Sequence, residues 1–191
     1  MVTLIPFPWG QYDPNIKLRP RSRTPGMTAR GIAVREELCT GCRACQVACV
    51  AKHDGRFGVS TARLRIVKNE SLGLDHPQVC RLCGRAPCMA RCPSKALYRD
   101  DTTSAVLLRA EMCDSCTACA EACPFGMVAL HPDTGLPLIC DMCGGKPACV
   151  RRCPTGAISY GDLPPESERP PAMHLVRPDP ASSHPRLGED G

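Results

Sequence analysis

Aromatic side chains are scarce in this sequence. They make up 4% of the 191 residues, as one Trp, three Tyr and three Phe. Aromatic residues normally contribute a large share of the apolar area buried in a core. A chain of this length with so few of them is poorly equipped for a conventional hydrophobic core. We therefore expect another kind of interaction to hold its interior together.

Long apolar runs are also missing. No stretch approaches the roughly 18 apolar residues that suggest a membrane-spanning helix. Pro6 and Pro8 interrupt the first ten residues, and no apolar segment of the signal-peptide type follows them. The sequence therefore predicts a cytoplasmic protein with no direct membrane insertion, in which thiols stay reduced.

Recognisable catalytic machinery is absent as well. The histidines are His53, His76, His131, His174 and His184. None sits in a ligand-spaced pair, and their loop contexts indicate surface or turn residues. The G-G-K stretch at 144–146 lies inside a cysteine motif and is not a phosphate-binding loop. The formal charge of +5 is only mildly basic. We therefore expect neither an enzyme that is catalytic alone nor a nucleic-acid partner.

Cysteine is what the chain has in abundance. All 16 cysteines lie between residues 39 and 153, in four motifs of four. The motifs are Cys39, Cys42, Cys45 and Cys49; Cys80, Cys83, Cys88 and Cys92; Cys113, Cys116, Cys119 and Cys123; and Cys140, Cys143, Cys149 and Cys153. The first and third follow the spacing C-x2-C-x2-C-x3-C, and the other two have a wider middle gap. This spacing is that of bacterial ferredoxins.

The cysteine count points to iron–sulfur chemistry. A [4Fe–4S] cluster takes four thiolates, so 16 cysteines predict four [4Fe–4S] clusters with none left over. Structural zinc is the main competitor, but zinc sites usually place two ligands on each of two separated knuckles. A zinc-stabilised interaction module is therefore the alternative from another functional class. Metal–thiolate bonds would supply much of the folding free energy in either case.

Short secondary-structure elements are expected around the motifs. The sequence patterns predict a helix over 44–52, a strand over 61–67 and turn chemistry over 69–77. Two hairpins are expected, one from 96–98 with 105–108 and one from 127–130 with 136–139. A last strand is expected over 157–160.

Two proline-rich tails flank the cysteine region. Residues 1–30 hold five basic residues and one acidic residue, which predicts an extended basic arm. Residues 162–191 hold six acidic residues and three arginines, which predicts an extended acidic tail. Tails of opposite charge could clamp a partner or link copies of the chain by self-association.

The four motifs resemble the four-cluster ferredoxin subunits of the dimethyl sulfoxide reductase iron–sulfur family. The resemblance covers about residues 35–160 and rests on four blocks. They are C-T-G-C-R-A-C-Q-V-A-C, C-R-L-C-G-R-A-P-C-M-A-R-C-P, C-D-S-C-T-A-C-A-E-A-C-P-F-G and C-D-M-C-G-G-K-P-A-C-V-R-R-C-P-T-G-A-I. The resemblance implies an α+β fold of two nested two-cluster ferredoxin modules. Residues 31–79 and 125–161 would form the outer module, and residues 80–124 the inner one.

The resemblance also implies how the ligands are shared, which spacing alone leaves open between nested and sequential pairing of the motifs. The implied sets are Cys39, Cys42, Cys45 and Cys153; Cys140, Cys143, Cys149 and Cys49; Cys80, Cys83, Cys88 and Cys123; and Cys113, Cys116, Cys119 and Cys92.

The family's role implies an electron-transfer subunit of an oxidoreductase complex. Such a subunit relays single electrons between a catalytic subunit, typically with a molybdenum or tungsten pterin, and a further electron donor or acceptor. Similar small ferredoxins serve aldehyde oxidoreductases, formate dehydrogenases and hydrogenases. The missing export and membrane signals favour a soluble complex of anaerobic metabolism, with an aldehyde oxidoreductase as the favoured catalytic partner. A freely diffusing polyferredoxin is the alternative.

Overall fold

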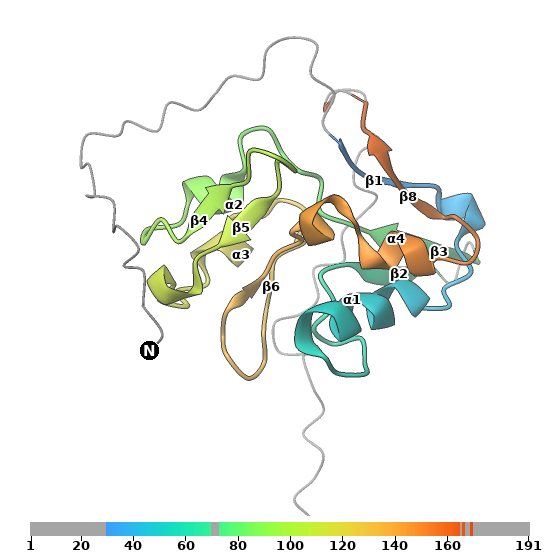
Figure 1. Ribbon diagram of the computed structural model, residues 1–191, viewed down its shortest axis with the longest axis horizontal. Helices are drawn as coiled ribbons and strands as arrows, with labels where there is room; N and C mark the ends of the chain where they lie inside the picture. The colour runs from blue at the N-terminus through green and yellow to red at the C-terminus, as the bar shows by residue number, and fades with distance from the viewer. Residues whose placement is uncertain (1–29, 70–72, 165, 167–168, 170–191) are drawn as a thin grey trace, which may run out of the picture.

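The computed structural model describes residues 30–69, 73–164, 166 and 169 (Figure 1). The expected basic arm lies outside the described residues except for Arg30. Most of the expected acidic tail lies outside them too, so the proposed clamp and self-association are not addressed by the fold. The packed part includes Arg30 and Asp162, which both belong to strands.

The described chain consists of short elements joined by loops. The strands are β1 (Arg30–Val34), β2 (Arg65–Asn69), β3 (Leu74–Gln78), β4 (Leu97–Arg99), β5 (Val106–Leu108), β6 (Ala129–Leu130), β7 (Pro137–Leu138) and β8 (Ile158–Asp162). The helices are α1 (Ala44–Asp54), α2 (Pro87–Ala90), α3 (Ala118–Glu121) and α4 (Ala148–Arg152), with 3₁₀ turns at Glu36–Leu38, Ala110–Met112 and Met142–Gly145. No helix in the described part is long and apolar enough to cross a membrane.

The two ends of the cysteine region lie side by side. Strand β1 pairs antiparallel with β8, in a register that sets Arg30 opposite Asp162 and Val34 opposite Ile158. Helix α1 packs against α4, and α2 packs against α3. The first and fourth motifs therefore lie together, and so do the second and third. The remaining ribbons, β2–β3, β4–β5 and β6–β7, are local antiparallel hairpins.

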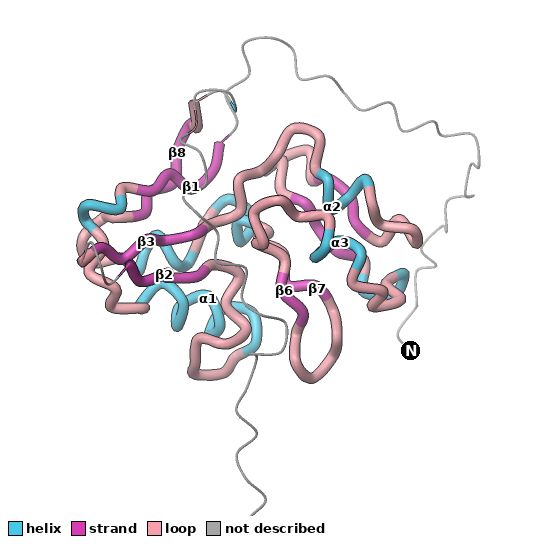
Figure 2. Tube along the Cα trace, turned by 180° about the vertical axis from the view of Figure 1, so that it is seen from behind, coloured by secondary structure: helices cyan, strands magenta, loops and turns pink. Residues whose placement is uncertain are grey.

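Two small apolar clusters form the interior. One joins β1, β8 and α1 through residues such as Ile32, Ile158 and Val50. The other lies around the β4–β5 hairpin and includes Val128 and Ile139, which flank β6 and β7. Figures 1 and 2 show α1, β2 and β3 on one side of the molecule and α2 and α3 on the other. Buried cysteines belong to both clusters.

Several expected elements are confirmed. The hairpin predicted over 96–108 is formed by β4 and β5, and its turn is closed by Asp100, whose carboxylate accepts the Thr103 N–H at 2.6 Å. The hairpin predicted over 127–139 appears as the shorter pair β6–β7. The last strand and the first helix are also present, each extending two residues beyond its expected end.

Other expected elements are wrong. The strand predicted over 61–67 begins only at Arg65, because the buried Thr61 turns back and donates its hydroxyl to Asp54 at the end of α1. The turn predicted over 69–77 is partly strand, since β3 begins at Leu74 and contains Pro77. Proline fits there because each strand of a two-stranded ribbon has one free edge. Strand β1 had not been predicted at all.

Leu163 closes the apolar cluster at the end of β8. Its side chain is 7% exposed and covers Gly31, where an added Cβ would come within 2.6 Å of Leu163 Cδ1. Leu82 also approaches the same position on Gly31. The segment just after β8 is thus part of the packed structure.

We expect Leu163→Ala to lower the free energy of unfolding by about 2–5 kcal/mol, because it leaves a cavity over Gly31. Denaturant unfolding followed by circular dichroism checks this. Leu74→Ala is the matched control, since Leu74 is 36% exposed and its truncation should change stability by less than about 1 kcal/mol. Equal losses in both variants would contradict the role given to Leu163.

Candidate metal centres

Each cysteine motif bends the chain two positions after its first cysteine. The backbone there is left-handed in all four motifs. The residues are Gly41 (φ +63°), Leu82 (φ +50°), Ser115 (φ +54°) and Met142 (φ +56°). For the three that are not glycine, this conformation costs about 1–2 kcal/mol each. Such a recurring strain indicates that the bend serves the site.

The bend aims backbone amides at sulfur. The amide of Gly41 donates to Cys39, that of Leu82 to Cys80 and that of Met142 to Cys140. In each case burial raises the thiol pKa and the N–H group lowers it. An N–H group on sulfur stabilises the thiolate, which is the form that binds metal.

The helices place the third and fourth cysteine of every motif. Each helix begins one residue before the third cysteine, and the fourth follows four residues later, after about one turn. The first amides of a helix have no intrahelical partner. Burial raises the pKa of each third cysteine, and the backbone N–H of the next residue lowers it, from Gln46 on Cys45, Met89 on Cys88, Ala120 on Cys119 and Val150 on Cys149. The amides of Gln46, Met89 and Ala120 also donate to a backbone carbonyl three residues earlier.

The thiols converge in four sets, each combining three cysteines of one motif with one cysteine of another. Set A is Cys39, Cys42, Cys45 and Cys153, which line one cavity. Set B is Cys49, Cys140, Cys143 and Cys149. Set C is Cys80, Cys83, Cys88 and Cys123. Set D is Cys92, Cys113, Cys116 and Cys119, which line a second cavity. Each set has the same members as one of the ligand sets that the resemblance implies.

The four sets follow one another in a row. Cys45 of set A lies close enough to Cys149 of set B for its thiolate to raise the pKa of Cys149. In the same way Cys140 of set B lies near Cys80 of set C, and Cys88 of set C lies near Cys119 of set D. Cys42 and Cys116, in the two end sets, are exposed. The row therefore runs A–B–C–D with an accessible sulfur at each end.

The middle of the row disfavours bare thiolates. Burial raises the pKa of Cys80 and of Cys149 to about 12, and that of Cys140 well above its usual value of 9.0. Neighbouring cysteines of the same set raise these pKa values further. At neutral pH these thiols stay protonated unless a bound cation displaces their protons. Four facing thiols with backbone N–H groups on their sulfurs fit a [4Fe–4S] cluster.

Hydroxyl groups lower the pKa of two cysteines that one motif contributes to the set of another. Burial raises the pKa of Cys92, but the Ser94 hydroxyl at 3.6 Å and the amides of residues 95–97 together outweigh it, so the pKa is lowered. Burial also raises the pKa of Cys153, but backbone amides and the Thr155 hydroxyl at 3.7 Å together outweigh it, so this pKa is lowered as well. Sequence reasoning missed Ser94 and Thr155. The repeated C-P-S and C-P-T endings of these two motifs were the signal that could have revealed them.

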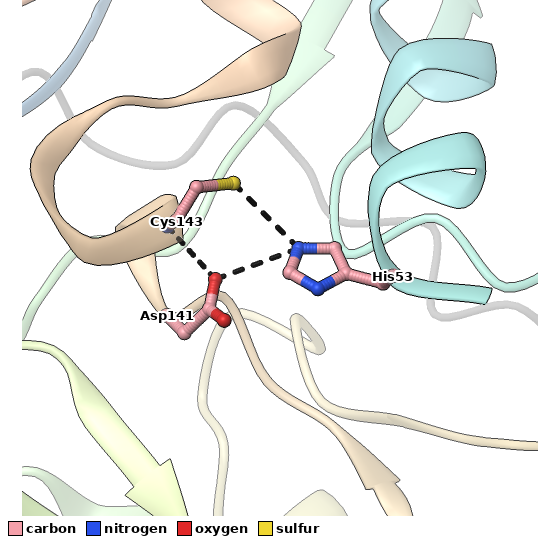
Figure 3. Close-up of side chains that lie close together, drawn as sticks. All are labelled: His53, Asp141 and Cys143. Atoms are coloured by element: carbon pink, nitrogen blue, oxygen red, sulfur yellow. Dashed lines mark hydrogen bonds and ion pairs between the residues drawn. The ribbon is translucent and has the colours of Figure 1, made fainter. Parts of the chain in front are cut away.

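His53 is not the surface or turn residue that the sequence suggested. It lies in the last turn of α1 with its side chain 12% exposed. Its Nε2 is 3.6 Å from Cys143 Sγ and 3.5 Å from Asp141 Oδ1 (Figure 3). Burial, followed by the nearby Arg63, lowers the pKa of His53 below its usual 6.5, so the imidazole is neutral at pH 7. Its closeness to set B depends on the contact between α1 and the fourth motif, which spacing cannot show.

Comparison with known proteins agrees with this chemistry. Residues 73–163 match the family described as 4Fe-4S dicluster domain. That segment contains three of the four cysteine motifs and leaves the motif at 39–49 outside the match. The match supports the expectation that cysteines of this segment hold [4Fe–4S] clusters.

Curated relatives point to one class of protein. The chain is 37% identical over 110 residues to the polyferredoxin-like subunit of the aliphatic sulfonate oxidoreductase of Pyrococcus furiosus, covering 58% of this chain and 63% of that protein. It is 39% identical over 112 residues to the thiosulfate reductase electron transfer subunit PhsB of Salmonella typhi, covering 56% and 58%. The chain thus spans less than two thirds of either relative. By their names, the first of these relatives is a polyferredoxin-like subunit of an oxidoreductase and the second is an electron transfer subunit of a reductase.

The comparison with solved structures gives a chain of low similarity. The active site complex BamBC of benzoyl coenzyme A reductase has a chain that is 24% identical, with a TM-score of 0.43 over 72% of this chain and 79% of that chain.

We expect removal of the metal to unfold most of the chain, because the two apolar clusters are small and the left-handed turns are strained. Circular dichroism and a thermal melt after chelation under reducing conditions check this. Adding iron and sulfide back should restore the spectrum. A metal-free chain with native-like circular dichroism and a cooperative melt would contradict the expectation.

Proposed function

We propose that this protein is an electron-transfer subunit that carries four [4Fe–4S] clusters and relays single electrons between a catalytic oxidoreductase subunit and a second redox partner. The observation that carries the proposal is the convergence of 16 cysteines into four sets of four. When bound, the clusters supply one-electron transfer. The rest of the proposal concerns what the residues of this chain do.

Sets A, B, C and D would each hold one cluster. Support comes from the shared pattern of the sets, in which three thiols sit on a loop and a helix start and one comes from a distant motif. Because sets A and B exchange Cys49 and Cys153, the outer pair would be tied together through its ligands. Sets C and D exchange Cys92 and Cys123 in the same way. This exchange is the reason to expect two nested modules.

The order of the sets suggests where partners dock. The exposed Cys42 and Cys116 lie in the two end sets, so a redox partner could approach sulfur at either end. Between the ends, the buried side chains of Leu82 and Met142 help to exclude water near sets B and C. One end would then face the catalytic subunit and the other a further donor or acceptor.

The catalytic partner that we favour is a molybdenum or tungsten pterin enzyme such as an aldehyde oxidoreductase. The support is the resemblance of the cysteine blocks, together with relatives that are subunits of an aliphatic sulfonate oxidoreductase and a thiosulfate reductase. Purification of the native assembly under anaerobic conditions tests the partner. A catalytic companion that stays with this chain supports a subunit, and a stable monomer without one supports a freely diffusing carrier.

We expect the anaerobically purified chain to contain about sixteen iron and sixteen sulfide ions, because four clusters of four fill all the thiols. Metal analysis and sulfide determination measure both. About four zinc ions with little iron would instead establish a zinc-stabilised module.

We expect Cys123→Ala to damage the cluster of set C, although Cys123 belongs by sequence to the motif that supplies set D. The check compares the electron paramagnetic resonance (EPR) spectra of single variants. Cys123→Ala and Cys83→Ala should lose the same signal, and Cys92→Ala and Cys116→Ala should share a different loss. If Cys123→Ala instead matched Cys116→Ala, the exchange of ligands between motifs would be wrong.

A further inference from the structure

Set B has a group of polar side chains around it that comes from three parts of the chain. His53 lies at the end of α1, four residues after Cys49. Asp141 lies between Cys140 and Cys143. Arg63 lies in the loop before β2, and its backbone N–H donates to Cys49 Sγ at 3.3 Å. The hydroxyls of Ser94 and Thr155 contact cysteines of sets D and A, whereas set B is contacted by an imidazole.

The Asp141 carboxylate holds the imidazole of His53 in position. Asp141 Oδ1 is 3.5 Å from His53 Nε2 and also accepts the Cys143 N–H at 2.9 Å. Asp141 Oδ2 is 3.0 Å from Arg63 Nη1. The carboxylate is therefore held by the Arg63 guanidinium and the Cys143 N–H, and it can in turn orient the His53 ring. Figure 3 shows His53, Asp141 and Cys143.

The surroundings assign the ring proton. Nε2 faces two acceptors, the Asp141 carboxylate and the sulfur of Cys143. An imidazole with its proton on Nε2 can donate to them, whereas one with its only proton on Nδ1 would turn the Nε2 lone pair toward these two acceptors. The structure thus presents an N–H group to the sulfur of a proposed cluster ligand.

We propose that His53, positioned by Asp141 and Arg63, raises the reduction potential of the cluster held by set B. The inference rests on the proposed function, since it requires that cluster. Reduction adds one negative charge, and part of that charge falls on the ligand sulfurs. An N–H group on sulfur stabilises the more negative state and so favours reduction. His53 is a positioning and tuning residue, which transfers no electron itself.

The test is a redox titration of the full-length chain, followed by EPR under anaerobic conditions. In His53→Leu, one of the clusters should become about tenfold harder to reduce, which for a one-electron couple corresponds to about 59 mV. His53→Gln should retain most of the parent potential, because its side-chain amide can present an N–H group at nearly the same place. His131→Leu is the matched control, since His131 Nδ1 accepts from two backbone amides of its own hairpin, and it should leave every potential unchanged.

Iron content separates the possible failures. A chain without clusters would overturn the proposed function and this inference together. A His53→Leu variant with a full complement of iron and unaltered potentials would overturn the inference alone.

A second measurement tests the inference even if the His53→Leu variant loses iron. With ¹⁵N-labelled histidine, pulsed EPR of the unsubstituted chain should detect a nitrogen coupled to one reduced cluster. That coupling should persist in His131→Leu and vanish in His53→Gln. If the unsubstituted chain showed no such coupling, the contact between His53 and Cys143 would not act on a cluster and the inference would fail.

Discussion

The convergence of four thiols at one point is the constraint on which the rest of this structure depends. Each thiolate repels its neighbours, and burial makes ionisation still less favourable, as the raised pKa values of Cys80 and Cys149 show. A cation that binds all four thiolates turns this repulsion into the strongest attraction in the molecule. A chain with few aromatic residues can then do without a large apolar core.

Much of the backbone serves sulfur. Left-handed residues after each first cysteine and helix starts at each third cysteine point amide groups toward thiolates. Leu82 and Met142 accept an unfavourable φ angle, and both side chains are buried. Local strain, hydrogen bonding and the exclusion of water thus occur at the same residues. Positions that would be ordinary turns elsewhere are here part of the metal environment.

The four sets share a pattern but are not equivalent. Sets A and D are at the ends of the row and each include an exposed cysteine, whereas no cysteine of sets B and C is exposed. Ser94 and Thr155 support a shared cysteine in sets D and A, and His53 approaches set B. Environments that differ in charge and in hydrogen bonding give chemically identical clusters different potentials. A row of sites built from repeated motifs can therefore acquire a direction.

The sequence by itself determined the chemistry and the local elements. Sixteen regularly spaced cysteines specify the cofactor class, since ligand type and spacing are local properties, and the hairpin of β4 and β5 is readable because its turn residues act locally. Tertiary structure decided which motifs lie together, because the contacts of α1 with α4 and of β1 with β8 join segments more than ninety residues apart. Without the family resemblance, spacing allowed two pairings of the motifs. Tertiary structure also decided that the His53 side chain lies against Cys143 and away from solvent. A lone histidine carries no sequence pattern that reveals what packs against it.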